Sequence, residues 1–282
     1  MEGAKRGKET SMWLAIQSVK EKMADIVISA GNTGALLVVA KLNLKMIENI
    51  DKPALSALWP NKKGMSVVLD LGANIECSSK NLMDFSIMGA SLYTSLYPDE
   101  KPNVALLNIG SEELKGNETI KETFQILNEK NSNNYNFAGY IEGNHLMDGD
   151  VNVIVSDGFT GNISLKTAEG TAKLFQSHLN DAFRSSILSK IGYFLSSLAM
   201  KSVRDRLDPR VHNCGIMMGL NSLAIKCHGQ SEYRGISYAS DIVYSLLENN
   251  VNKKIQDYVH EIQNLSLIHI SEPTRRRGIA YA

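Results

Sequence analysis

The sequence of 282 residues lacks the features that mark several large classes of protein. Its three cysteines, Cys77, Cys214 and Cys227, do not have the spacing of a metal site or a disulfide framework. No apolar run approaches the roughly 20 residues that cross a bilayer, and no apolar core follows the charged start, as a secretory signal requires. Basic and acidic residues both number 30, so no net charge attracts nucleic acid. We therefore expect a soluble, cytoplasmic protein that does not bind nucleic acid.

Several common catalytic motifs are also absent. The chain contains no Gly-x-x-x-x-Gly-Lys-Ser/Thr loop for nucleotide phosphates and no Gly-x-Gly-x-x-Gly fingerprint for a dinucleotide. It has no Gly-x-Ser-x-Gly turn that would expose an activated serine. Cys77 follows a Gly-bearing loop, but no residue near it in the sequence would activate its thiol. We therefore expect no metal, no cofactor and no nucleophilic side chain.

What the sequence does contain is an alternation of short apolar runs with segments of helical length. The runs are rich in Val, Ile and Leu and cover residues 25–29, 66–71, 103–109, 136–141 and 151–156. Near-continuous apolar runs are typical of parallel strands that are covered on both faces. Segments 35–47, 82–96 and 118–127 have apolar residues at helical spacing. This alternation predicts an α/β layered sheet.

The second half of the chain is predicted to be mainly helical. Long helical patterns cover residues 163–180, 183–207 and 237–262, and an apolar stretch rich in Gly and Met covers 214–226. The pattern stops abruptly at residues 265–282, which resemble an accidental translation of sequencing-adaptor DNA. A natural disordered tail is the alternative. We predict one α/β domain over residues 1–264 and treat residues 265–282 as a non-native tail.

Four of the five predicted strands end in a polar loop that contains glycine. These loops cover residues 29–34, 70–74, 108–117 and 156–162. Ligands of open α/β sheets bind outside the carboxyl ends of the strands, so we expect the four loops to converge on one crevice. Glycine lets backbone N–H groups approach an anion, and a following helix N-terminus adds partial positive charge. The loops therefore predict a site for an anionic ligand.

The same loops resemble those of a known enzyme family. The matching runs are Ser29-Ala-Gly-Asn-Thr-Gly-Ala, Asp70-Leu-Gly-Ala-Asn, Asn108-Ile-Gly-Ser-Glu-Glu-Leu-Lys-Gly-Asn and Asp157-Gly-Phe-Thr-Gly-Asn. A late run, Gly219-Leu-Asn-Ser-Leu-Ala-Ile-Lys-Cys-His-Gly, also matches, with Ser222 in place of the usual glycine. From about residue 4 to 262 the chain resembles the phosphate:acyl-acyl carrier protein acyltransferases of bacterial phospholipid synthesis, the PlsX family.

The resemblance implies a fold, an assembly and a reaction. The fold is a Rossmann-like α/β/α sandwich, related to isocitrate dehydrogenase and phosphotransacetylase, with a helical hairpin insertion, and it works as a homodimer. The enzyme moves a fatty acyl group from acyl carrier protein to inorganic phosphate, and a downstream membrane acyltransferase uses the acyl phosphate. Peripheral contact with the membrane is also implied. Relative to the family, the chain is expected to lack an N-terminal portion with the opening strand.

Two residues are the candidates for catalysis. Attack of phosphate on a thioester builds negative charge, so the site must supply positive charge and preorganised donors. The resemblance points to Lys115, a lysine within a matched loop that would hold phosphate and offset this charge. A solvated surface lysine is the alternative. Asn162 stands at a natural N-cap position before a long helix, and its amide is either a cap or a donor to the reacting oxygens.

Other loop residues are candidates for binding. The uncharged loop positions that would contact phosphate or pantetheine are Asn32, Thr33, Gly34, Asn74 and Asn117. Asp157 either orients Lys115 or caps a turn. His228 either protonates the leaving thiolate or is a structural histidine.

Segment 183–207 carries basic residues between apolar ones. They are Arg184, Lys190, Lys201, Arg204 and Arg206. An ordinary helix or helical hairpin packed on the core is one interpretation. The other is a hairpin at a dimer edge that grips acidic acyl carrier protein or contacts anionic lipid.

Three rival functions remain open at this stage. A phosphotransacetylase-like enzyme would use a coenzyme A thioester, whereas the basic segment favours a protein carrier. A nucleotide-binding dehydrogenase on the related fold would need a metal-binding carboxylate cluster and a hydride acceptor site, and the sequence offers neither. The third alternative is an inactive fragment.

Overall fold

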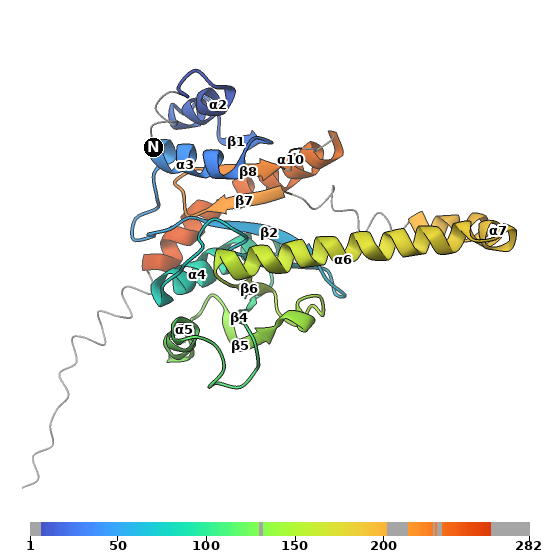
Figure 1. Ribbon diagram of the computed structural model, residues 1–282. Coiled ribbons are helices and arrows are strands. Elements are labelled where there is room, and N and C mark those ends of the chain that lie inside the picture. Colours follow the sequence, from blue (N-terminus) through green and yellow to red (C-terminus); the bar gives the residue numbers. More distant parts are fainter. Residues whose placement is uncertain (1–6, 130–131, 202–213, 228, 230–232, 261–282) are drawn as a thin grey trace, which may run out of the picture.

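The computed structural model describes residues 7–129, 132–201, 214–227, 229 and 233–260 (Figure 1). Within these residues, eight strands form one mixed sheet in the order β1-β8-β7-β2-β3-β6-β4-β5. The strands are β1 (Ile26–Ser29), β2 (Ala54–Pro60), β3 (Met65–Leu69), β4 (Asn103–Asn108), β5 (Asn136–Glu142), β6 (Val153–Val155), β7 (Cys214–Met218) and β8 (Leu223–Cys227).

Five strands confirm the predicted apolar runs to within two residues at each end, and three strands are additional. The additional strand β2 is antiparallel to both of its neighbours, and its residues alternate in burial, so it lacks a continuous apolar run. Strands β7 and β8 form an antiparallel hairpin, and Gly219 begins its turn with a φ of +87°. The sequence marks this hairpin only as an apolar stretch, because glycine and methionine are weak indicators of strands.

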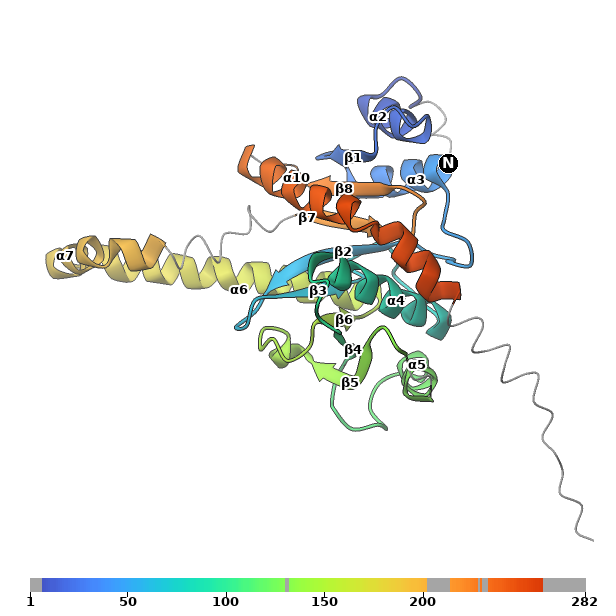
Figure 2. The ribbon, with the colours of Figure 1, turned by 180° about the vertical axis from the view of Figure 1, so that it is seen from behind.

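Helices cover both faces of the sheet (Figures 1 and 2). One face carries α2 (Ser11–Lys20), α3 (Thr33–Leu44) and α6 (Gly158–Arg184), and the other carries α4 (Ser79–Leu96), α5 (Glu118–Glu129) and α10 (Tyr233–Glu248). Strand β3 shows how the two layers arise from its sequence. Val67 and Leu69 pack in the cluster that contains α4, whereas Val68 between them packs in the cluster beside α6. Alternate side chains thus reach opposite layers.

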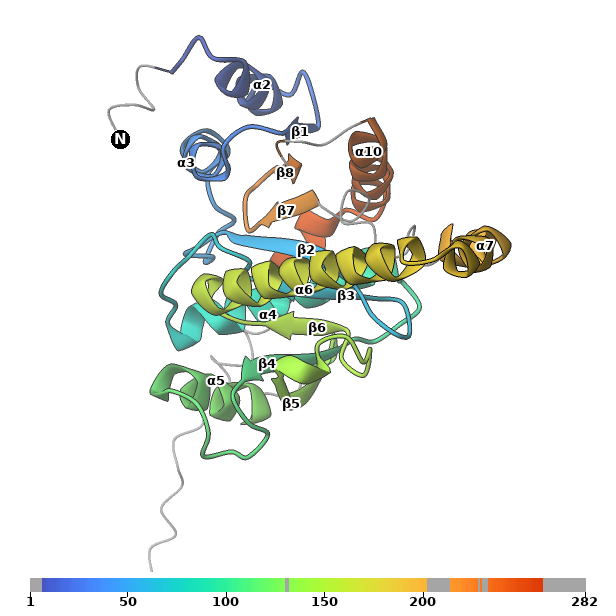
Figure 3. The ribbon, with the colours of Figure 1, turned by 45° about the vertical axis from the view of Figure 1, so that its right-hand side comes forward.

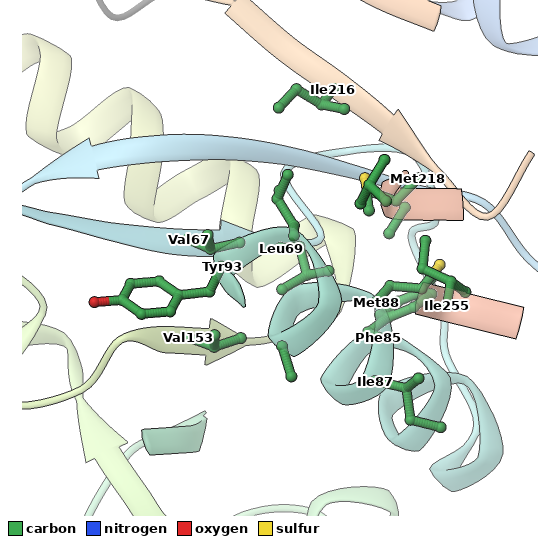
Figure 4. Packing of buried hydrophobic residues seen from close by; sticks show 14 of the residues in the cluster. Val67, Leu69, Phe85, Ile87, Met88, Tyr93, Val153, Ile216, Met218 and Ile255 are labelled. Carbon is green, nitrogen blue, oxygen red and sulfur yellow. The ribbon is translucent and has the colours of Figure 1, made fainter. Parts of the chain in front are cut away.

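Helix α4 lies at the centre of the larger core (Figure 4). It begins with a capping box, in which the Ser78 hydroxyl accepts from Asn81 N–H and the Asn81 side chain accepts from Ser78 N–H. Its Phe85 and Met88 are fully buried. Each fully buried side chain of this size contributes about 1.5–3 kcal/mol relative to an exposed one.

The direction of the strands reverses across the sheet. Strands β3, β6, β4 and β5 are parallel to one another. Strand β2 is antiparallel to β3, β7 to β2, and β8 to β7, and β1 is parallel to β8. Strands β1 and β8 therefore run opposite to β3, β6 and β4, and their carboxyl ends point to the other edge of the sheet.

A long helical arm, formed by the later turns of α6 and by α7, projects from the sandwich (Figures 1 and 3). The two helices predicted at 163–180 and 183–207 are divided differently, because α6 is continuous to Arg184 and α7 covers Ile187–Leu195. Residues 202–207 of the second prediction lie outside the described residues. Within the described part of the chain, no helix combines the length and apolarity needed to span a membrane.

The predicted final helix is interrupted once. Helix α10 ends at Glu248, and a further helical segment covers residues 251–260. Asn250 between them has a φ of +47°, a left-handed conformation that asparagine tolerates better than most residues. The proposed non-native tail, residues 265–282, lies outside the described residues.

A partly buried ion group lies at the start of α4. Lys80 Nζ lies 2.9 Å from Asp84 Oδ2 and 3.0 Å from Asp51 Oδ2, and it donates to the Asn49 carbonyl. The side chain of Asp84 is only 5% exposed. Burial raises the pKa of Asp84 to about 6, although Lys80 acts in the opposite direction. The folded chain therefore holds this proton more tightly than the unfolded chain does.

Replacing Asp84 should change how stability depends on pH. As pH rises from about 4 to about 6, the unfolded chain loses the Asp84 proton first, so this group lowers the free energy of unfolding. Asp84→Asn removes the titration. From pH 4 to pH 6, the free energy of unfolding of the parent should therefore fall relative to that of the variant, by an amount on the order of 2 kcal/mol. Urea unfolding at pH 4, 5, 6 and 7 measures it, and parallel curves would contradict the assignment.

Candidate active site

Three of the four glycine-bearing loops lie at the same edge of the sheet. They follow β3, β6 and β4, which are adjacent and parallel, so the gathering predicted for residues 70–74, 156–162 and 108–117 is confirmed. The prediction is wrong for residues 29–34. Strand β1 runs in the opposite direction, and its loop leaves from the other edge. The sequence cannot show this reversal, because β2, β7 and β8 cause it.

The residues of the fourth loop have local roles in the structure. The Asn32 side chain accepts from Ala35 N–H at 3.0 Å and caps α3, which Thr33 begins. Gly34 follows in the first turn and is exposed. Strand β8 ends at the same edge of the sheet as β1. His228, which follows β8 and is predicted to protonate the leaving thiolate or to be structural, lies outside the described residues.

Asp70 organises the loop after β3. Its side chain is fully buried, and Oδ1 accepts from the N–H groups of Leu55, Gly72 and Ala73 at 2.9–3.1 Å. Oδ2 accepts from Asn74 N–H and from the Asn74 side chain, both at 2.8 Å. Burial raises the pKa of Asp70, and these hydrogen bonds only partly offset the effect. The loop's N–H groups thus bind the protein's own carboxylate, not an external anion as the sequence predicts.

The Asn74 amide is also engaged within the protein. Its Nδ2 donates to Asp70 Oδ2 at 2.8 Å and to the Pro53 carbonyl at 2.7 Å, which uses both hydrogens. An anionic ligand would meet only the oxygen of this amide, which is an acceptor. The geometry favours a structural role for Asn74 in holding its loop to the segment before β2.

The start of α6 is capped by Asp157, not by Asn162. Asp157 Oδ1 accepts from Thr160 N–H and Oδ2 accepts from the Thr160 hydroxyl, both at 2.8 Å. The capping alternative for Asp157 is therefore confirmed, and no ion pair joins it to Lys115 among the described residues. Asn162 lies one turn into the helix, where its Nδ2 donates to the Leu71 carbonyl at 3.0 Å. One amide hydrogen is thereby fixed to the loop that Asp70 organises.

Glycines allow α6 to lie directly against this loop. The N–H of Gly158 donates to the Asn74 carbonyl at 2.8 Å, and a Cβ at Gly158 would lie 2.5 Å from the same oxygen. A Cβ at Gly161 would overlap the Asp70 carbonyl oxygen. The glycines of Asp-Gly-Phe-Thr-Gly-Asn therefore serve backbone-to-backbone packing, which brings Asn162 to Leu71.

The loop after β4 exposes the candidate lysine. Asn108 is buried and donates to the Lys115 carbonyl at 3.1 Å, which fixes the backbone of the loop. The Lys115 side chain is exposed, and within the described residues its ammonium has neither an ion pair nor a hydrogen bond. Asn117 accepts from Ile120 N–H at 2.9 Å and caps α5. Lys115 is therefore a cation held by its backbone and free to meet an anion.

Cys77 lies beside the loop after β3 but is a poor nucleophile. Burial raises the pKa of its thiol to about 11, and the nearby Asp70 and Asp157 act in the same direction. Thiolate is the reactive form, so little of it is present near neutral pH. Among the described residues, no three His, Cys, Asp or Glu side chains are grouped as metal ligands would be.

The basic residues of the arm are only partly described. Arg184 ends α6, Lys190 lies on α7, and Lys201 follows it, and all three side chains are exposed. Arg204 and Arg206 lie outside the described residues. No side chain of residues 183–201 is buried, so the described part of segment 183–207 is not packed on the core as the ordinary-helix interpretation predicts.

Asp70 is not among the site residues predicted from the sequence. The sequence does carry a signal for it, because an acidic residue directly after a buried strand, in Asp-Leu-Gly-Ala-Asn, can accept the loop's N–H groups in an Asx-type turn. The fivefold acceptance and the contact with α6 depend on residues 55 and 158–162, which are distant in the sequence.

Comparison with known proteins identifies close relatives in sequence. The family model described as "fatty acid synthesis protein" matches residues 1–254. A phosphate acyltransferase of Pelagibacter ubique is 65% identical over 259 residues, which are 92% of this chain and 78% of the relative. A phosphate acyltransferase of Rhizobium leguminosarum bv. trifolii is 44% identical over 254 residues, 90% of this chain and 73% of the relative.

Solved structures share the fold at much lower identity. The EutD phosphotransacetylase from Staphylococcus aureus has a TM-score of 0.55 and 14% identity, covering 83% of this chain and 66% of that chain. A phosphotransacetylase from Streptococcus pyogenes has a TM-score of 0.51 and 17% identity, covering 86% and 67%. The expected Rossmann-like α/β/α sandwich of the phosphotransacetylase type is thereby confirmed.

The close packing of α6 on the loop after β3 predicts opposite effects on stability for substitutions at two glycines of this helix. Gly161→Ala should destabilise the protein by about 3 kcal/mol or more, because its Cβ has no room beside Asp70 and Ser156. Gly170→Ala is the matched control, since a Cβ there meets nothing within 4 Å. It should stabilise the helix by up to about 1 kcal/mol. Denaturant unfolding of both variants tests this, and equal effects would refute the close approach.

Proposed function

The chain belongs to the fatty acid synthesis protein family, and we propose that it transfers a fatty acyl group from a thioester to inorganic phosphate. The observation that carries this proposal is the 65% identity to a phosphate acyltransferase over 92% of the chain. A phosphate oxygen attacks the thioester carbonyl carbon, and the carbon–sulfur bond then breaks. The products are an acyl phosphate and a thiol, whose sulfur takes up a proton.

The site's chemistry suits phosphate as the nucleophile. The reaction needs no thiolate or alkoxide from the protein, which agrees with the raised pKa of Cys77. It does need positive charge, because the oxyanion develops beside an already anionic nucleophile. Lys115 supplies that charge from the loop after β4, where no other described group pairs with it. Asn162 supplies a neutral donor from the first turns of α6.

We further propose acyl carrier protein as the thioester donor, with coenzyme A as the alternative. Carrier proteins of this type are acidic, and the arm presents the exposed cations Arg184, Lys190 and Lys201. Complementary charge of this kind mainly accelerates association. A small thioester would not need cations on an arm that projects away from the sandwich (Figure 3).

The arm also supports assembly as a homodimer. On α7, Ile187, Leu188, Phe194 and Leu195 are each 77–82% exposed, and Leu174 and Phe175 on α6 are 58% and 57% exposed. A row of exposed apolar side chains on a projecting helix is typical of an interaction surface. A second copy of the same arm would cover it by pairing apolar faces.

Lys115→Met should separate the catalytic from the surface interpretation of this lysine. The change keeps the aliphatic stem and removes the charge, so folding should persist while turnover falls by about 10²–10³. The assay incubates long-chain acyl-carrier protein with phosphate and traps acyl phosphate with hydroxylamine.

Lys121→Met is the matched control for that experiment. Lys121 lies in the first turn of α5 and pairs with the exposed Glu118 at 3.3 Å, a surface contact of little energetic weight. Its loss should leave turnover near the parental rate. Equal rates for the Lys115 and Lys121 variants would remove Lys115 from the mechanism.

Charge introduced on the arm should dissociate the proposed dimer. Leu188→Asp combined with Leu195→Asp places two carboxylates on the exposed apolar face of α7. We expect a dimeric parent and a monomeric variant by light scattering after size exclusion. Leu14→Asp with Leu42→Asp is the control, because these leucines of α2 and α3 are 54% and 53% exposed away from the arm. A variant that remains dimeric would place the interface elsewhere.

A further inference from the structure

Asp70 is a buried carboxylate that no cation accompanies. Within the described residues it forms no ion pair, and its charge is met only by four backbone N–H groups and the Asn74 amide. Buried carboxylates usually lie beside a cation or a metal. Here the whole compensation comes from donors that must be arranged around it, so the carboxylate and its loop fix each other's geometry.

Stability alone does not account for this charge. Burial raises the pKa of Asp70 even after the hydrogen bonds are included, so the folded chain holds the proton more tightly than the unfolded chain. By linkage, the ionised carboxylate therefore opposes folding relative to the neutral acid. A buried ionisable group whose charged form lowers the stability of the fold is characteristic of functional sites.

The loop that Asp70 arranges is the surface on which α6 begins. Leu71, next to Asp70, accepts from the Asn162 amide at 3.0 Å. Asn74, at the other end of the loop, accepts from Gly158 N–H at 2.8 Å. The Asp70 backbone lies against Gly161 so closely that a side chain there is excluded. Each contact depends on the loop conformation that the carboxylate fixes.

We propose that Asp70 is a positioning residue that sets the orientation of the Asn162 amide for acyl transfer. By drawing the N–H groups of residues 72–74 inward, it fixes the Leu71 carbonyl, which holds one Asn162 hydrogen and leaves the second for the substrate. Asp70 itself does not contact the reacting atoms. This assignment rests on the proposed function, and it explains why the donors of this loop are used internally.

The test is a double-mutant cycle between Asp70 and Asn162. Asp70→Asn keeps the shape of the side chain. Both carboxylate oxygens accept from N–H donors, so the new amide nitrogen, itself a donor, must face N–H groups in either orientation, and the loop shifts. We expect kcat to fall about 10–100-fold, as for other residues that orient a functional group, with the KM for phosphate little changed. Asn162→Ala should lower kcat about 10²–10³-fold. The double variant should be no slower than Asn162→Ala, because Asp70 acts through Asn162.

Asp84→Asn is the matched control, since it removes another buried carboxylate from α4 and should leave kcat at the parental value. Thermal melts show that each variant is folded at the assay temperature. If Asp70→Asn does not fold, Asn74→Ala replaces it, because that change removes one of the five donors and keeps the carboxylate. Its loss in kcat should be smaller and should again vanish in the Asn162→Ala background.

The outcomes separate the two proposals. A parent that forms no acyl phosphate would overturn the proposed function. Hydrogen exchange then tests separately whether Asp70 positions the Asn162 amide. Exchange of the Asn162 amide hydrogen that is bonded to the Leu71 carbonyl, followed by NMR, should be slow in the parent and faster in Asp70→Asn. With an active parent, losses that multiply in the double variant, or an Asp70→Asn kcat near the parental value, would overturn the positioning role. Unchanged exchange would do the same.

Discussion

The contact between the loop after β3 and the first turns of α6 is the constraint on which the site depends. Asp70 draws the loop around its carboxylate, and the loop presents two carbonyl groups to the helix. Gly158 and Gly161 let the two backbones meet without intervening side chains. Strand β3 is tied to β2 by pairing and by the bond from Leu55 N–H to Asp70. The position of Asn162 therefore follows from the sheet through a short chain of backbone contacts.

This arrangement changes how the site can bind an anion. Glycine-rich loops after strands are usually interpreted as sources of free N–H groups, but those of residues 72–74 are already bound to Asp70. A buried negative charge also lies behind them. In the proposed function, the attraction for phosphate comes instead from the loop after β4, where Lys115 is exposed and its backbone is held by Asn108. The internal anion and the exposed cation thus follow β3 and β4, two parallel strands that are separated by β6 in the sheet.

Local patterns in the sequence predict the parallel half of the sheet well and the rest poorly. Strands β3, β4 and β6 are buried on both faces, and their continuous apolar runs identify them, together with the loops that follow. The antiparallel strand β2 alternates in burial, and β7 contains Gly215 and Met218, so neither resembles such a run. Missing these strands hides the reversal of direction that separates Asn32 from the other loops. The sequence can indicate the local bonds of Asp70 to residues 72–74, but not its contacts with β2 and α6, which only the fold brings to it.

Helix α6 is one continuous helix that joins this site to the tip of the arm. Its 27 residues span about 40 Å, and Asn162 lies near the end that is packed on the sandwich. The first turns of this helix are fixed by the close contacts of Gly158 and Gly161 with the loop after β3. A bound molecule that tilted α7 would therefore also tilt the turn that carries Asn162, because α6 is continuous from that turn to Arg184. The close backbone packing at Gly161 leaves this end of the helix little freedom, so a tilt of the arm would press the helix against the loop after β3.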